Sequence, residues 1–252
     1  MEDTILDIVD LLDSTELTDV VHGIDQLDLL LSQLLPQIVA MHKRGTVTST
    51  NSGIPDSKSL ATFVALQDNF QYNLAHYLIN FYKFLAKDPR EVDPKAILTC
   101  NRLLQGLLLI HPSLRKLFSR LSNMRLLLVL VDQGTFSIQI TISFISTLIH
   151  ILLKDLKNFR IFEDNGGCSI LIRKFKLASF DELPKSNSNI KVYTQQNLNF
   201  KIIEFLIFYL VDETNFKSTI TPKTVAEKSA LFKADFPEID SLIENLNELN
   251  NL

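Results

Sequence analysis

Apolar residues recur along most of this chain at the spacing of amphipathic helices. Near the start, Ile5, Ile8, Val9 and Leu12 fall at i, i+3, i+4 and i+7, which places them on one helical face. Only seven glycines and eight prolines interrupt the pattern. Helices are predicted at 4–13, 15–42, 60–86, 95–110, 112–121, 123–131, 135–154, 168–177, 195–211, 223–233 and 237–249. The sequence therefore predicts an all-α fold.

Two polar stretches lack the helical period. Residues 43–59, rich in Ser, Thr and Gly, predict a flexible loop, and residues 178–194 predict a polar insert. Pro36 is expected to kink or end its helix, and the pair His111-Pro112 to end another. Helices with short breaks over nearly the whole length favour a single helical-repeat domain at 1–252.

An internal repeat supports this interpretation. Placing Phe118 on Phe162, 44 residues later, also pairs Met124 with Cys168 and residues 126–128 with 170–172. Armadillo and HEAT units repeat every ~40–47 residues. Each copy is expected to hold a short helix, a turn, an apolar helix and a long apolar helix. The prediction is an armadillo/HEAT-like helical solenoid.

The segment from Gln133 to Leu153 contains no Asp, Glu, Lys or Arg. It has about the length of a membrane-spanning helix. However, it carries many hydroxyl and amide side chains, while its apolar residues fall mostly on one face. We therefore predict a central helix of a layered stack and no membrane insertion.

Charge and cysteine content narrow the class further. The net charge of −4 gives no general attraction to nucleic acid, so no nucleic-acid partner is expected. Cys100 and Cys168 form no disulfide framework and no zinc spacing, and we interpret them as buried thiols in a reducing compartment. The acidic N-terminus lacks the basic start of a signal peptide, which favours a cytoplasmic or nuclear location.

Motifs that carry chemistry are missing from the sequence. There is no glycine-rich phosphate loop, no His-Glu-x-x-His, no Cys-x-x-Cys and no Gly-x-Ser-x-Gly, and the five histidines have no ligand spacing. Glu163, Asp164, Asp212 and Glu213 fall at predicted helix ends, where we interpret them as solvated caps. We expect no catalytic residue, no metal, no cofactor and no enzymatic activity.

Polar residues inside otherwise apolar helices have two interpretations. Hydrogen bonding between helices, or a solvated face, is the one we favour. The other is a partner-binding surface, because Arg and Tyr often anchor interfaces. The candidate partner-binding residues are Asn69, Tyr72, Arg115, Arg120, Arg160, Glu204 and Tyr209.

Five segments resemble, in order, motifs of one fungal family. They are "LQDNFQYNLAHYLI", "LLQGLLLIHPSLRKLFSRLSNMRLLLVLVD", "NFRIFEDNGG", "KIIEFLIFYLVDE" and "TPKTVAEKSALF". The family is that of cell division control protein fourteen of the septation initiation network, unrelated to the phosphatase of the same name. The similarity runs from about residue 17 to 249.

This resemblance implies a non-catalytic regulatory or adaptor subunit of a germinal-centre-type Ser/Thr protein kinase. It would act in the cytoplasm at the spindle pole body or division site, in the pathway of mitotic exit, septation and cytokinesis. The alternative is a structural scaffold of the spindle pole body or septum machinery that does not activate a kinase. An enzyme of unknown type is a third hypothesis. Homo-oligomerisation is left open and is not predicted.

Overall fold

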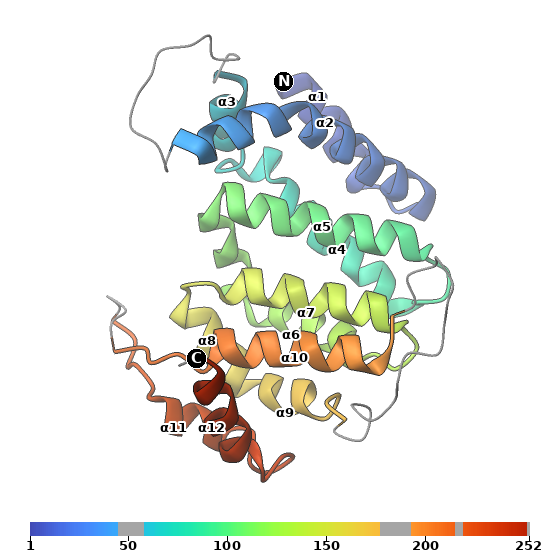
Figure 1. Cartoon of the computed structure of the whole chain (residues 1–252). Coiled ribbons are helices and arrows are strands. Elements are labelled where there is room, and N and C mark those ends of the chain that lie inside the picture. Colours follow the sequence, from blue (N-terminus) through green and yellow to red (C-terminus); the bar gives the residue numbers. More distant parts are fainter. Residues whose placement is uncertain (45–57, 177–192, 215–218, 251–252) are drawn as a thin grey trace, which may run out of the picture. The chain divides into compact units, whose positions relative to one another are not determined.

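The computed structural model describes residues 1–44, 58–176, 193–214 and 219–250 (Figure 1). These residues form α-helices and 3₁₀ helices and contain no strand, which confirms the all-α prediction. Most of the loop predicted at 43–59 and of the insert predicted at 178–194 lies outside the described residues.

The chain divides into two compact units, Met1–Leu117 and Phe118–Leu252. The single helical-repeat domain expected at 1–252 stays a prediction. The 3₁₀ helix η2 (Pro112–Ser119), where an α-helix was expected, contains the point of division.

Four helices form the centre of the first unit. α1 packs on α2 and α4, and α5 packs on α2 and α4. Ile5, Ile8, Val9 and Leu12 are all buried, as their spacing predicts. Pro36 lies inside α2, so the helix does not end there, and the alternative expectation of a kink at Pro36 stays a prediction. The elements are α1 (Glu2–Leu12), α2 (Leu17–Arg44), α3 (Lys58–Leu66), η1 (Phe70–Tyr72), α4 (Leu74–Lys87) and α5 (Pro94–Ile110).

The single helix predicted at 60–86 is wrong, because the chain breaks between α3 and α4. The buried Gln67 causes the break: its Oε1 accepts from the backbone N–H of Leu74 at 3.0 Å, and its carbonyl accepts from Asn73 Nδ2 at 2.9 Å. Asn69 caps η1, and the side chain of Asn73 caps α4 by accepting from His76 N–H. Such side-chain bonds replace the backbone bonds of a continuous helix.

The second unit contains the first copy of the 44-residue repeat from Phe118 on and the second copy. α7 packs against α6 and α10, and α6 also packs against α9, so the equivalent helices of the two copies lie against each other (Figure 1). Phe118, Phe162, Met124 and Cys168 are buried. This stacking is consistent with the solenoid prediction. The helices are α6 (Leu121–Asp132), α7 (Ile138–Leu152), α8 (Leu156–Asp164), α9 (Gly167–Ile172), α10 (Gln195–Tyr209), α11 (Val225–Ala230) and α12 (Ile239–Asn250).

α7 lies in the uncharged segment of the sequence. Phe144 and Leu148 are fully buried, whereas Thr147 Oγ1 and His150 Nδ1 bond to backbone carbonyls four residues earlier in the same helix. These polar side chains are therefore satisfied within their own helix. Within the ranges that the structure describes, no helix is both long and apolar enough to cross a bilayer.

Candidate functional site

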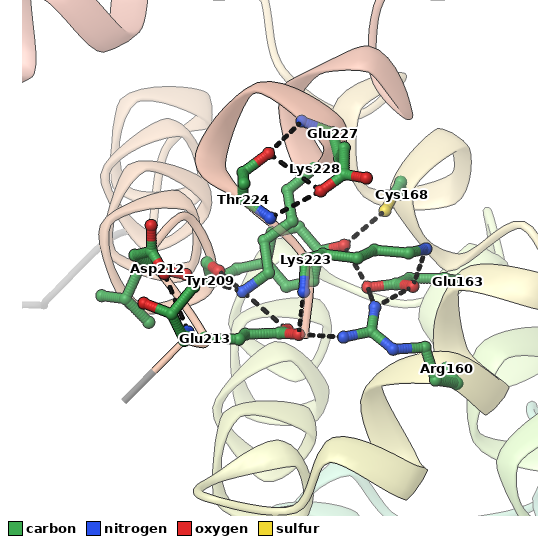
Figure 2. A network of polar contacts seen from close by, with 12 residues as sticks. Arg160, Glu163, Cys168, Tyr209, Asp212, Glu213, Lys223, Thr224, Glu227 and Lys228 are labelled. Carbon is green, nitrogen blue, oxygen red and sulfur yellow. Dashed lines mark hydrogen bonds and ion pairs between the residues drawn. The ribbon is translucent and has the colours of Figure 1, made fainter. Parts of the chain in front are cut away.

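A buried ionic cluster joins three segments of the second unit (Figure 2). α8 supplies Arg160 and Glu163, the residues after α10 supply Glu213, and the α11 region supplies Lys223 and Lys228. These five residues are called the ionic cluster below. Each segment falls within one of the motifs on which the family resemblance rests.

Arg160 bridges the two carboxylates. Its Nη1 donates to both oxygens of Glu163, at 2.7 and 2.5 Å, and its Nη2 donates to Glu213 Oε2. Lys223 Nζ lies 2.5 Å from Glu163 Oε2. The side chains of Glu163 and Glu213 are 1% and 0% exposed. The interpretation of Glu163 and Glu213 as solvated caps is wrong, because both carboxylates are buried and paired with cations.

Lys228 is fully buried. Its Nζ lies 2.8 Å from Glu213 Oε1 and donates to the backbone carbonyls of Tyr209 and Val211, each at 2.8 Å. The same nitrogen is 5.0 Å from the ring centroid of Phe159, a cation–π distance. Burial lowers the pKa of Lys228, and the hydrogen bond and charge of Glu213 oppose that shift. The ammonium thus has three polar partners for its three donors.

Tyr209 completes the cluster from within the aromatic core. Its hydroxyl donates to Glu163 Oε1 at 2.7 Å, and its ring stacks on Phe205. Burial and the charge of Glu163 raise the pKa of Tyr209, so the hydroxyl remains a neutral donor. Cys168 Sγ lies 3.7 Å from the same hydroxyl, and burial raises the pKa of this thiol to about 12.

Backbone bonds fasten the same segment. Lys223 N–H donates to Glu213 Oε2 at 2.8 Å, and Glu213 N–H donates to the Lys223 carbonyl at 3.3 Å. Thr224 and Glu227 then form a reciprocal capping box at the start of α11. The ionic cluster therefore ties the C-terminal segment to α8 and α10.

The arrangement suits a structural link. Glu163 faces Arg160 and Lys223, while Glu213 faces Arg160 and Lys228, so both buried carboxylates are paired with cations. In the described parts of the chain, no group of three or more His, Cys, Asp or Glu residues could hold a metal ion.

A second polar group lies in the first unit. His111 Nε2 is 2.8 Å from Asp68 Oδ1 and also 2.8 Å from Ser113 Oγ. A Ser-His-Asp triad uses one ring nitrogen for the acid and the other for the serine. Since both contacts fall on one nitrogen, this geometry fastens the end of α5 to the turn after α3 and does not form a proton relay.

The candidate partner-binding residues differ in accessibility. Asn69, Arg120 and Glu204 are exposed, Tyr72 and Arg160 are half-buried, and Arg115 and Tyr209 are buried. Arg115 Nη2 donates to the Leu108 carbonyl, and Glu204 pairs with Lys201 at 2.6 Å. The assignment of these residues to a partner surface stays a prediction.

Arg160 and Tyr209 are two candidates that lie far apart in the sequence and share one partner in the structure. Arg160 and Tyr209 both bond to Glu163, whereas Asn69, Tyr72 and Arg115 belong to the first unit. The sequence interpretation did not assign Lys223 or Lys228 to any site. The sequence feature nearest to these two lysines is the capping-box spacing of Thr224 and Glu227. This spacing marks the start of a helix, but it does not reveal which charged residues are buried when the helix packs.

The fold and the ionic cluster define a class: an all-helical protein with stacked repeats and a buried polar link at its C-terminal end. A family model, described as cell division control protein 14, SIN component, matches residues 1–223. The chain belongs to this family, a component of the septation initiation network of fungal cell division. No curated protein and no solved structure gave a match.

Proposed function

We propose that this protein is a non-catalytic adaptor subunit that binds a germinal-centre-type Ser/Thr protein kinase in the septation initiation network, at the spindle pole body or the division site. The family match over residues 1–223 carries this proposal, because it places the chain among the components of that network. The kinase partner and the non-catalytic role are what we propose beyond this family membership.

The exposed face of α10 is the surface we assign to the kinase. Phe200, Glu204 and Ile207 lie in α10 at spacings of four and three residues, and Val211 follows just after the end of this helix; all four are exposed. They are called the α10 ridge. Ile207 and Val211 remain 48% and 43% exposed, although both side chains are large and apolar.

α10 and the neighbouring α7 carry little charge. α7, which packs beside α10, contains no Asp, Glu, Lys or Arg. The charged residues of α10 are Lys201 and Glu204, which pair with each other. Cores of protein interfaces are depleted in charged residues and enriched in aromatic ones. These features support a partner-binding surface in the second unit.

Binding by itself does not change kinase activity. An adaptor shifts a kinase towards its active form only if it binds that form more tightly than the inactive one. A tenfold shift requires a difference of about 1.4 kcal/mol between the two binding free energies. A rigid helical surface provides such a difference when only one kinase conformation fits it.

The decisive experiment is co-expression with each germinal-centre-type kinase of the host, followed by gel filtration and a kinase assay. A stoichiometric complex with raised activity supports an activating subunit, and a complex with unchanged activity supports a localising one. If none of these kinases forms a complex with the protein, the proposal is overturned and the structural scaffold is favoured.

Point variants test the surface separately. Ile207→Asp is expected to raise the Kd for the kinase at least about tenfold, since central apolar anchors dominate interface energies. Glu204→Lys and Arg120→Glu test the exposed charged candidates. Val129→Asp, at an equally exposed position on α6, is the matched control and should bind normally. Arg115→Glu is unsuitable because its guanidinium is buried.

A further inference from the structure

Thr221 stands in a sequence context that occurs once in this chain. Of the eight prolines, only Pro222 directly follows a serine or threonine. Proline-directed protein kinases require a proline immediately after the acceptor hydroxyl. Proline also biases the preceding residue towards extended backbone, the conformation in which kinases bind their substrates. The chain therefore offers such kinases a single acceptor.

The acceptor is accessible in the structure. Thr221 is exposed and lies outside any helix, between α10 and α11. Three residues later, Thr224 is engaged differently, since its hydroxyl is part of the capping box of α11. Accessibility and irregular backbone distinguish Thr221 from hydroxyl groups that act in helix capping.

A negative charge added at Thr221 would lie close in sequence to Lys223, a cation of the ionic cluster. Lys223, two residues later, holds Glu163 through Nζ and Glu213 through its backbone N–H. Figure 2 shows Lys223 extending to Glu163 from the segment that precedes α11. The ionic cluster contains three cations and two carboxylates, and the Lys223 side chain is 28% exposed. Lys223 is therefore the cation of the cluster that solvent and a neighbouring phosphate reach most easily.

We propose that Thr221 is a phosphorylation site for a proline-directed Ser/Thr kinase and that its phosphate loosens the ionic cluster. The kinase transfers the γ-phosphoryl group of ATP to Thr221 Oγ1. The new O–P bond replaces the bond between the β- and γ-phosphates, ADP leaves, and the hydroxyl proton passes to the base of the kinase.

The added group competes for a cation that the cluster needs. A phosphothreonine carries a charge of about −1.5 to −2 at pH 7 and attracts Lys223 away from Glu163. Glu163, whose side chain is 1% exposed, then keeps Arg160 as its remaining cation. A buried carboxylate that loses a partner weakens the structure around it. The inference does not depend on the kinase partner proposed above.

The test uses the purified full-length chain, a cyclin-dependent kinase as the proline-directed enzyme, ATP and mass spectrometry. We expect one phosphate per chain, on Thr221. Thr221→Ala and Pro222→Ala should both abolish it, whereas Thr219→Ala, which removes a neighbouring exposed hydroxyl, should not. Absence of phosphate on Thr221, or an unchanged rate in Pro222→Ala, overturns the assignment.

Hydrogen exchange tests the effect on the cluster. Amides in α11 of the phosphorylated chain should exchange about tenfold faster than before, which corresponds to a weakening of ~1.4 kcal/mol. Amides of α7 serve as the internal control and should not change. Stoichiometric phosphorylation with unchanged exchange in α11 would overturn the proposed effect on the ionic cluster.

Discussion

Lys228 Nζ lies 2.8 Å from Glu213 Oε1, and both side chains are completely buried. Transfer of two such charges out of water is costly, and a close pair offsets this cost only when further hydrogen bonds satisfy the remaining donors. The carbonyls of Tyr209 and Val211 supply those bonds. The pair thereby attaches α11 to the end of α10.

Removing the cation should therefore destabilise the second unit strongly. Lys228→Met leaves Glu213 buried without one of its partners, and loss of one member of a buried pair costs about 3–5 kcal/mol. Urea denaturation followed by circular dichroism measures this loss. Lys233→Met, which breaks the exposed pair with Asp240, is the matched control and should lose much less stability.

The double variant separates charge from packing. Glu213→Leu/Lys228→Met removes both charges of the fully buried pair and leaves Arg160 and Lys223 paired with Glu163, so its loss of stability should be smaller than that of Lys228→Met alone. A Lys228→Met protein as stable as the wild type would contradict the structural role of the pair.

Acid should weaken the start of α11. The backbone N–H and hydroxyl of Thr224 donate to Glu227 and lower the pKa of Glu227 below its usual value of 4.5. As pH falls, the unfolded chain binds this proton first, so the contribution to stability is present above about pH 4.5 and is lost as the pH falls through the folded-state pKa. Urea midpoints measured from pH 6 to pH 3 should show that loss.

Two variants identify the group responsible. Glu227→Gln keeps a capping box but does not titrate, so its acid-dependent loss should be shallower. Thr224→Ala removes the hydroxyl donor but keeps the backbone N–H. It should lower stability at neutral pH by about 1 kcal/mol and flatten the acid dependence only in part. Wild-type slopes in both variants would exclude Glu227 as a source of the acid sensitivity.

The two thiols should react slowly in the folded protein. Cys100 and Cys168 are buried, as the sequence predicted, and burial raises the pKa of both, that of Cys168 to about 12. Because the thiolate is the reactive form, iodoacetamide should label both residues rapidly only in urea. Peptide mass spectrometry reports each site separately.

The same labelling experiment tests the ionic cluster. Cys168 contacts Tyr209, whose carbonyl binds Lys228, so Lys228→Met should accelerate labelling of Cys168. Cys100 lies in the other unit and provides the internal control. Equal acceleration at both thiols would indicate general unfolding and contradict a local effect.

Gly167 has a steric requirement at the start of α9. A Cβ atom at this position would overlap the ring of Phe162, whereas a Cβ at Gly106 in α5 meets no atom within 4 Å. Gly167→Ala should therefore destabilise the protein by about 1–3 kcal/mol through overpacking. Gly106→Ala should stabilise it by up to about 1 kcal/mol, since alanine favours helix. Thermal unfolding compares the two, and equal effects would show that Phe162 moves away without cost.

Helical periodicity predicted which apolar residues are buried, because the face of a helix on which a residue lies depends only on its spacing from neighbours in the chain. Ile5 and Leu12 are buried as expected, and so are Phe118 and Phe162 of the two repeat copies. The break between α3 and α4 was missed because Gln67 acts through bonds to Asn73 and Leu74, which a count of apolar residues does not include.

The sequence by itself determined the all-helical class, the repeat and most helix ranges, since each follows from local spacing. Only the tertiary structure decided which charged residues are buried. Lys223 and Glu163 are 60 residues apart in sequence, and Arg160 and Glu213 are 53 apart. Whether a carboxylate is solvated or enclosed depends on the segments that fold against it, and no local pattern contains that information.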